Sequence, residues 1–150
     1  MNYWLMKSEP DVFSITDLKM KNSTAWDGVR NYQARNYMRD QMRKNDLVFF
    51  YHSNAEPSGI AGIARVCKEN YPDPTQYDKK SDYFDPKATK EIPIWFLVDV
   101  EFVQEFPVIS LETLKKDPAL KSLPLVQKGS RLSVLPISEE HWQHILKKYT

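Results

Sequence analysis

The chain has very little cysteine and glycine, and it has no long hydrophobic run. Its single cysteine, Cys67, excludes an internal disulfide and fits a reducing compartment. The four glycines do not have the spacing of a phosphate-binding or dinucleotide-binding loop. No apolar stretch is long enough for a transmembrane helix, and the apolar start is too short for a secretory signal. A chain of 150 residues can bury roughly two-thirds of its unfolded surface, so we expect one domain over residues 1–150.

Net charge is also nearly absent, with a formal value of +1 at pH 7. A strong overall excess of Lys and Arg, the usual first sign of nucleic-acid binding, is therefore missing. Any contact with nucleic acid must come from a local cluster of basic side chains, because the field of the whole protein is weak.

Apolar runs of strand length recur along the chain and are separated by polar breaks. Strands are predicted at residues 3–6, 47–51, 59–66, 94–103 and 131–135. Helices are expected after the N-cap candidates Ser14, Asn31, Ser110 and Ser138, the second of them running to about Met42. The short strands do not alternate regularly with helices, so we predict an α+β fold, a small mixed β-barrel with flanking short helices.

Two stretches of the chain suggest special backbone features. Gly59 and Gly62 fall inside the strand predicted at residues 59–66, where glycine marks a bulge, a barrel corner or a close backbone approach. Residues 71–93 are polar and contain four prolines, which predicts a long loop.

Candidate catalytic side chains are sparse. His141 and His144 fall beside the apolar stripe of the last predicted helix, and we interpret them as solvated surface residues. Cys67 and His52 are a possible nucleophile pair, although a lone cysteine in an apolar strand is more often a small core residue. We therefore predict no catalytic residues, no metal site and no cofactor.

Residues 26–36 are the strongest candidate for a binding segment. Trp26 precedes a glycine turn that leads into a helix start rich in Arg, Asn and Gln. A helix start can bind phosphate, and a flat indole beside it can stack on a base. Arg35, Arg39 and Arg43 would continue a basic stripe along the helix. The competing interpretation is a core tryptophan next to an ordinary solvated helix face.

Two further polar clusters stand at the ends of apolar strands, at residues 6–10 and 50–54. Short polar groups in such a place can read the edge of a small flat ligand. Each cluster taken alone is equally explained as a strand that leaves the sheet and enters a loop.

Together these segments resemble the successive motifs of the EVE-domain family, in the order and spacing of that family and over almost the whole chain. The segments that carry the resemblance are residues 6–10, 26–36, 50–54, 59–62, 71–74 and 131–134. The resemblance implies a PUA-like fold, shared with the YTH readers of methylated adenine in RNA. It also implies a non-enzymatic reader of modified bases, and in nuclear relatives the base is 5-methylcytosine or one of its oxidised forms in DNA.

Matched motif by motif, the resemblance implies a base pocket. Trp26 would supply the stacking wall, and the pocket mouth would be formed by Lys7, Ser8 and Glu9. The segment that holds the nucleic-acid backbone would comprise Arg30, Asn31, Tyr32, Gln33, Arg35 and Asn36. The opposite wall would be formed by Tyr51, His52 and Ser53, with Arg131 nearby. Trp95 or Tyr71 is a candidate to complete an aromatic cage.

The expected partner is nucleic acid that carries a modified base, as DNA or RNA, and no membrane partner is expected. Because the chain begins directly at its first predicted strand, without the basic tail of nuclear relatives, we expect a bacterial and cytoplasmic protein. Three alternatives stay open from the residues alone. They are a binder of modified RNA, a small hydrolase that uses Glu9, His52 or Cys67, and a protein-interaction module that uses the basic helix.

Overall fold

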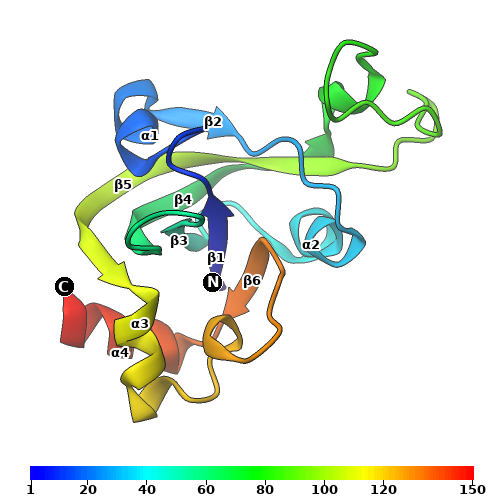
Figure 1. Cartoon of the computed structure of the whole chain (residues 1–150). Helices are drawn as coiled ribbons and strands as arrows, with labels where there is room; N and C mark the ends of the chain where they lie inside the picture. Colours follow the sequence, from blue (N-terminus) through cyan, green and yellow to red (C-terminus); the bar gives the residue numbers. More distant parts are fainter.

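The computed structural model describes residues 1–150, and a six-stranded mixed sheet forms its centre (Figure 1). The strands lie in the order β2-β5-β4-β3-β1-β6. Their bounds are Tyr3–Ser8 (β1), Ser23–Ala25 (β2), Leu47–His52 (β3), Gly59–Pro72 (β4), Phe96–Ser110 (β5) and Val134–Ile137 (β6). The α+β class is confirmed. The predicted barrel is wrong, because the short edge strands β2 and β6 pair only with β5 and β1 and leave the sheet open.

Strand β1 lies inside the sheet, which explains its apolar sequence. It runs parallel to β3 and antiparallel to β6. Its side chains alternate between the two faces of the sheet and are buried on both, as expected for a continuous apolar run. Pro136 of β6 pairs with Trp4 from the edge of the sheet, where a proline removes no hydrogen bond from the interior.

Strands β4 and β5 form the longest pair and are irregular. The pairing shifts register between Ile60 and Gly62 and at three later points. A Cβ atom on Gly59 would lie 2.1 Å from the backbone oxygen of Ile109, and one on Gly62 would lie 2.3 Å from that of Gln104. The prediction that these glycines mark bulges or a close backbone approach is therefore confirmed.

Both long strands extend beyond their predicted ends. The β4 strand continues to Pro72 through exposed polar residues, and β5 continues to Ser110 through a largely exposed stretch. Polar residues are expected where a strand leaves the covered part of a sheet, so the hydrophobic pattern stops before the strand does. The loop predicted at residues 71–93 is shorter than expected, since β4 includes residues 71–72 and a 3-10 turn, η2, spans Pro74–Tyr77.

The four predicted N-caps are all confirmed. Ser14 forms a reciprocal capping box with Asp17, and Asn31, Ser110 and Ser138 each accept a backbone hydrogen bond from their own helix. The helices are Ile15–Lys21 (α1), Tyr32–Asn36 (α2), Leu111–Lys116 (α3) and Glu139–Tyr149 (α4). After α2 the chain continues as one wider π-helical turn, Tyr37–Gln41 (η1), so the second helix reaches the predicted end. Short 3-10 turns span Pro118–Leu120 (η3) and Pro124–Val126 (η4).

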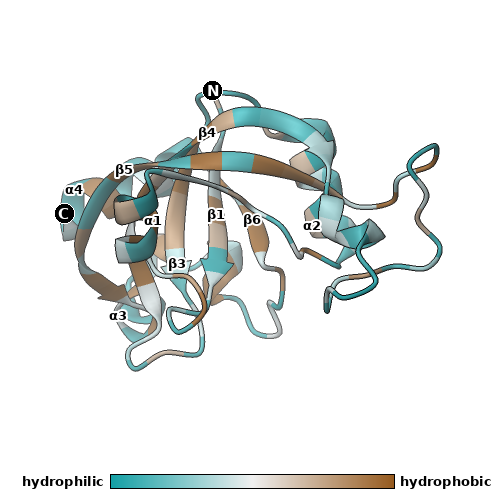
Figure 2. Ribbon diagram, turned by 90° about the horizontal axis from the view of Figure 1, so that it is seen from above, coloured by the Kyte–Doolittle hydropathy of each residue, from teal (hydrophilic) through white to brown (hydrophobic).

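The sheet separates two hydrophobic cores. Trp4 and Met6 point into one core together with Phe50 and helix residues such as Met38, whereas Leu5 points into the other. The helices α3 and α4 cover the second core, on the lower side of Figure 1, and α1 and α2 lie on the other side. Figure 2 shows apolar strands in the middle and polar helices and loops around them. None of the helices has the length and apolar character needed to cross a membrane.

Candidate functional site

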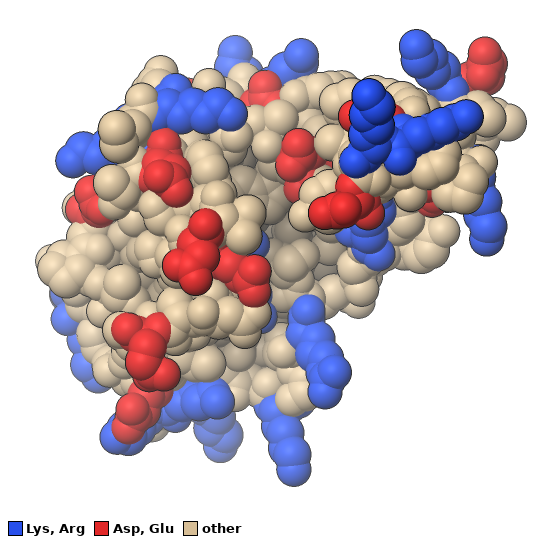
Figure 3. Space-filling model, turned by 45° about the horizontal axis from the view of Figure 1, so that its top comes forward, with Lys and Arg blue, Asp and Glu red and all other residues tan.

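A cavity of about 540 Å³ opens at the end of β1. Its walls come from the turn after β1, from the segment that follows β2, and from the projecting loop of residues 78–93, called here the arm (Figure 1). The lining residues are Lys7, Ser8, Glu9, Val12, Phe13, Lys21, Thr24, Ala25, Trp26, Asp27, Gly28, Val29, Arg30, Tyr83 and Ser133. Figure 3 shows a hollow near the middle of this side of the molecule, with acidic and basic side chains around it. The volume falls within the range of small-molecule sites, about 300–1,000 Å³.

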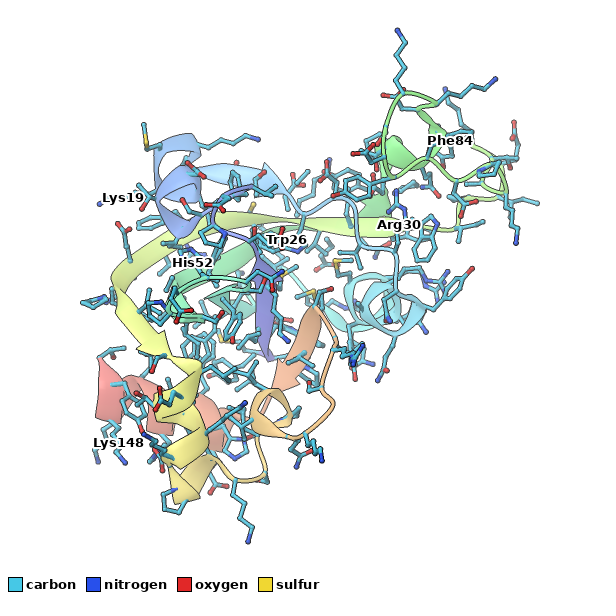
Figure 4. All side chains as sticks on the ribbon, viewed as in Figure 1. Lys19, Trp26, Arg30, His52, Phe84 and Lys148 are labelled. Carbon is cyan, nitrogen blue, oxygen red and sulfur yellow. The ribbon has the colours of Figure 1, made fainter.

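Trp26 belongs to the hydrophobic core and to the cavity wall at the same time. Its side chain is packed edge-on against Phe50, with ring centroids 5.5 Å apart, and the residue is 8% exposed. Its backbone N–H donates to the oxygen of Val98, which extends the pairing of β2 with β5. The indole is a core side chain, as one of the two interpretations expects, and its remaining surface lines the cavity, where the other interpretation places it (Figure 4).

The three residues predicted for the pocket mouth all line the cavity. The Ser8 hydroxyl donates to the backbone oxygen of Phe13, and the Glu9 carboxylate accepts from the Asn54 amide. The Lys7 ammonium lies 5.6 Å from the centre of the Tyr51 ring, and burial lowers the pKa of Lys7. A carboxylate, a hydroxyl and an ammonium group thus stand within one small opening.

Asp73 holds the segment after Trp26 in place. Its buried carboxylate accepts from the Gly28 N–H at 2.9 Å and from the Arg30 guanidinium at 3.1 Å. Burial alone would raise the pKa of Asp73, but hydrogen bonds from Thr75, Gly28 and Arg30 outweigh it and keep that pKa below its ordinary value. Arg30 also donates to the backbone oxygen of Tyr83 at 2.7 Å, which fastens the arm to the cavity.

Gly28 allows the arm to approach the cavity closely. Its φ is +81°, a conformation that favours glycine, and a Cβ atom there would lie 2.7 Å from the Tyr83 ring. The Tyr83 side chain therefore forms a wall of the cavity directly over the Gly28 backbone.

Several lining residues were missed by the sequence predictions. Tyr83 lies in the polar arm, where no periodicity marks it, whereas Ser133 lies inside the strand predicted at residues 131–135 but was not singled out there. Asp27 lies inside the segment 26–36, as do the lining residues Gly28 and Val29, so the sequence offered a means of finding them. Burial and the charge of Asp73 raise the pKa of Asp27, while Lys21 and Arg30 oppose that shift.

Most of the predicted backbone-holding residues lie next to the cavity rather than in it. Arg30 lines it, whereas Asn31 caps α2 and the Gln33 amide donates to the Tyr37 hydroxyl. The Arg35 guanidinium donates to the backbone oxygen of Ile94 at 2.9 Å and to the Asn36 side chain. Tyr32 projects outward and stacks on Trp95.

The residues predicted for the opposite wall do not line the cavity. Tyr51 is 4% exposed and belongs to the core on the other face of the sheet. The His52 Nε2 atom accepts from the backbone N–H of Ile15, the first residue of α1, and the Ser53 N–H donates to the oxygen of Ser8. Ordinary alternation along β3 explains the position of Tyr51, since Phe50 points into the core that contains Trp26 and Tyr51 points to the other face of the sheet.

Neither candidate for the aromatic cage lines the cavity. The Trp95 indole donates to Asp85 at 2.8 Å, and the Tyr71 hydroxyl donates to Asp99. The aromatic residues that do line the cavity are Phe13, Trp26 and Tyr83. Arg131 is exposed, and its neighbour Ser133 reaches the cavity instead.

The remaining histidines and the cysteine have other roles. His144 is half-buried rather than fully solvated, and its ring forms a hydrogen bond with the buried Asp117 carboxylate at 2.8 Å. His141 is half-buried and lies 3.2 Å from the Ser122 hydroxyl. Cys67 is half-buried rather than a core residue, and burial raises the pKa of its thiol.

The open sheet, together with a cavity that combines a tryptophan wall with a charged rim, defines a small α+β protein with a candidate ligand site. Its family follows from comparison with known sequences. The EVE domain matches residues 2–148, and the chain belongs to the EVE-domain family.

Relatives with known sequences or structures cover nearly the whole chain. Thymocyte nuclear protein 1 of Mus musculus is 44% identical over 165 residues, which cover 97% of this chain and 72% of that protein. A crystal structure of a protein from Pseudomonas syringae is 54% identical, with a TM-score of 0.93 and 97% of both chains covered. Human thymocyte nuclear protein 1, crystallised with DNA that contains 5-methylcytosine, is 42% identical with a TM-score of 0.88, and the match covers 98% of this chain and 96% of that one.

Proposed function

We propose that the protein is a non-enzymatic reader of a modified base in nucleic acid, with a 5-methylcytosine-like base in DNA as its ligand. The observation that carries this proposal is the cavity of about 540 Å³ with Trp26 in its wall and charged groups at its rim. The human relative that was crystallised with 5-methylcytosine-containing DNA supports the choice of base.

The base must leave its stack before it enters the cavity. Flipping a base out of a duplex costs a few kcal/mol, and stacking on an aromatic side chain returns roughly 1–3 kcal/mol. Trp26 and Tyr83 provide two aromatic walls, and the edge-on contact with Phe50 restricts the movement of Trp26. Because the Trp26 wall is held before the ligand arrives, little of its stacking energy is lost in ordering it.

The polar groups of the cavity suit the edge of a cytosine. Cytosine presents an amino group, which can donate a hydrogen bond to a carboxylate. Glu9 and Asp27 are the carboxylates in the lining. Lys7 can donate to the ring nitrogen or the carbonyl oxygen of the base. Burying one methyl group contributes about 0.8 kcal/mol, or roughly fourfold in affinity. The apolar side chains of Val12 and Phe13 are the candidates for that contact.

The segment 30–36 has a supporting role in this proposal. Arg30 donates through all three of its nitrogens to groups of the protein, so it shapes the wall more than it contacts a phosphate. Arg35 and the exposed Arg131 are the cations expected to meet the nucleic-acid backbone near the opening. We infer further that the open sheet is a variant of the PUA-like architecture, and that the chain is a single EVE domain acting in a bacterial cytoplasm.

The first test is a titration with matched DNA and RNA oligonucleotides, in which tryptophan fluorescence reports binding. The oligonucleotides carry cytosine, 5-methylcytosine, 5-hydroxymethylcytosine or N6-methyladenine at one position. We expect one modified DNA to bind most tightly. We also expect Trp26→Ala to weaken this binding by about 5- to 150-fold, the loss of one stacking contact, as measured by anisotropy of a labelled oligonucleotide.

Trp26→Phe is the matched control, because it keeps an aromatic wall and most of the packing on Phe50. Thermal unfolding of both variants separates lost binding from lost folding. Equally weak, salt-sensitive binding of every oligonucleotide would contradict a base reader. Tightest binding of a modified RNA would select the alternative of an RNA reader.

A further inference from the structure

Four planar side chains form a column that leads from the cavity to the surface. Tyr83 lines the cavity, and the Arg30 guanidinium carbon lies 5.5 Å from the centre of its ring. The same carbon lies 5.2 Å from the ring of Trp95, which in turn stacks on Tyr32 with centroids 4.9 Å apart and planes 25° apart. Figure 4 shows Arg30 on the side of Trp26 that faces the arm.

Tyr32 is the outermost member of this column. It is 58% exposed, whereas Trp95 behind it is 5% exposed and is fixed by its hydrogen bond to Asp85. Its ring is therefore held flat from one side and offered to solvent on the other.

Arg35 lies beside this stack and does not cover it. Its guanidinium carbon is 4.8 Å from the Tyr32 ring and 5.9 Å from the Trp95 ring. If Arg35 lay on the outer face of Tyr32, its distance from Trp95 would be nearly the sum of the Arg35–Tyr32 and Tyr32–Trp95 distances. The measured 5.9 Å is much shorter, so Arg35 stands at the edge of the Tyr32 ring, where hydrogen bonds to Ile94 and Asn36 hold it.

We propose that Tyr32 is a second base-stacking site, which binds an unpaired nucleobase close to, but not next to, the base in the cavity. Arg35 at the ring edge contacts the phosphate of that nucleotide. This inference rests on the proposed function. Tyr32 then stacks on a base, in place of the contact with the nucleic-acid backbone that the sequence predicts for it. Three successive distances of about 5 Å each separate Tyr83 from Tyr32 along the column. This separation exceeds the spacing of about 3.4 Å between neighbouring bases of a stacked strand, so the two bases are not adjacent in the strand.

The stacking site is tested by comparing a short ligand with a long one. The short ligand is the nucleoside 5-methyl-2′-deoxycytidine, and the long one is a single-stranded DNA 9-mer with 5-methylcytosine at its centre. We expect Tyr32→Ala to weaken binding of the 9-mer by about 5- to 150-fold and to leave binding of the nucleoside unchanged. Tyr32→Phe is the matched control and should bind both ligands as the wild type does.

A set of 9-mers with one abasic site at each flanking position locates the second base. In the wild type, an abasic site at one of these positions should lower the affinity as much as Tyr32→Ala lowers it for the intact 9-mer. In Tyr32→Ala the same abasic site should cost nothing more, because the base and the ring form one contact.

The outcomes separate this inference from the proposed function. Equal binding of the methylated 9-mer by wild type and a folded Tyr32→Ala variant would overturn the stacking site and leave the reader intact. Absence of nucleoside binding and of any preference for methylation would overturn the reader. In that case, weaker binding of an unmodified 9-mer by Tyr32→Ala would still support the stacking site.

Discussion

Gly28 and Gly129 share an unusual backbone conformation and differ in their surroundings. Their φ angles are +81° and +82°. A Cβ atom at Gly28 would meet the far end of the Tyr83 ring at 2.7 Å, while one at Gly129 would have nothing within 4 Å. The pair therefore separates backbone strain from the position of the cavity wall.

Gly28→Ala should weaken ligand binding, and Gly129→Ala should not. Both substitutions cost roughly 1–2 kcal/mol of stability from the left-handed backbone, or about 2–8 °C in Tm. Only the first also displaces Tyr83, which is 43% exposed and can turn away from the cavity. Thermal unfolding and the oligonucleotide titration measure the two effects. A Gly28→Ala variant that binds as well as Gly129→Ala would show that Tyr83 does not contribute to the binding wall.

The site could be predicted in part from local sequence. Trp26 and the neighbours of Ser8 were found because they form compact motifs at the ends of predicted elements. Tyr83 could not be found in this way, since its place depends on hydrogen bonds from Arg30, more than fifty residues away along the chain. Tyr51 was assigned to the wrong face because β3 is apolar on both faces, and a continuous apolar run does not tell the two faces of a strand apart.

At the scale of an element, the start of α1 depends on a neutral histidine. The Nε2 atom of His52 accepts from the Ile15 N–H at 3.1 Å, so a proton on that nitrogen would remove the hydrogen bond. Burial lowers the pKa of His52, against the opposing charges of Glu105 and Asp17. The neutral form is thus favoured in the folded state.

Stability from this contact should be complete above about pH 6.5 and should decline as the pH falls through the lowered pKa. His52→Gln keeps an acceptor oxygen without a titrating group. Between pH 7.5 and 5, we expect the wild-type Tm to fall by roughly 2–4 °C more than that of the variant, the effect of one hydrogen bond. The rest of the sequence is the same in both proteins, so its contribution to the pH dependence cancels in the difference. Parallel Tm curves would mean that His52 does not support α1.

The elements differ in how much of them the sequence could predict. Each of the four helix starts was found because a cap is local and depends on one side chain, such as Ser138, and on the N–H groups that follow it. The ends of β4 and β5 were missed because their exposed residues do not alternate between apolar and polar. The openness of the sheet could not be predicted either, since it depends on whether β2 and β6 meet, which no local pattern records.

At the scale of the whole molecule, the balance of charge should make binding only mildly dependent on salt. The formal net charge is +1, and Arg30 and Arg39 are paired with acidic side chains. Each phosphate contact with a single strand adds about −0.7 to the slope of log affinity against log salt.

We expect a slope of about −2 or shallower for the methylated 9-mer, measured between 50 and 300 mM salt. Arg35→Gln should make this slope shallower by about 0.7, the contribution of one phosphate contact. The matched control is Lys148→Gln, because Lys148 belongs to α4, on the side of the sheet away from the cavity, and pairs there with Asp117. A slope as steep as −4 would indicate a broad basic surface that the arrangement of charges does not provide.

The pairing of β6 with β1 joins residues that are far apart along the chain. During synthesis, β1 can pair with β3 and β3 with β4 well before residues 134–137 leave the ribosome. Until then the outer edge of β1, which carries Trp4 and Met6, stays open, and an open apolar edge invites pairing with other chains. The nascent protein is therefore most vulnerable to aggregation late in translation, and a chaperone that shields this edge would matter most at that stage.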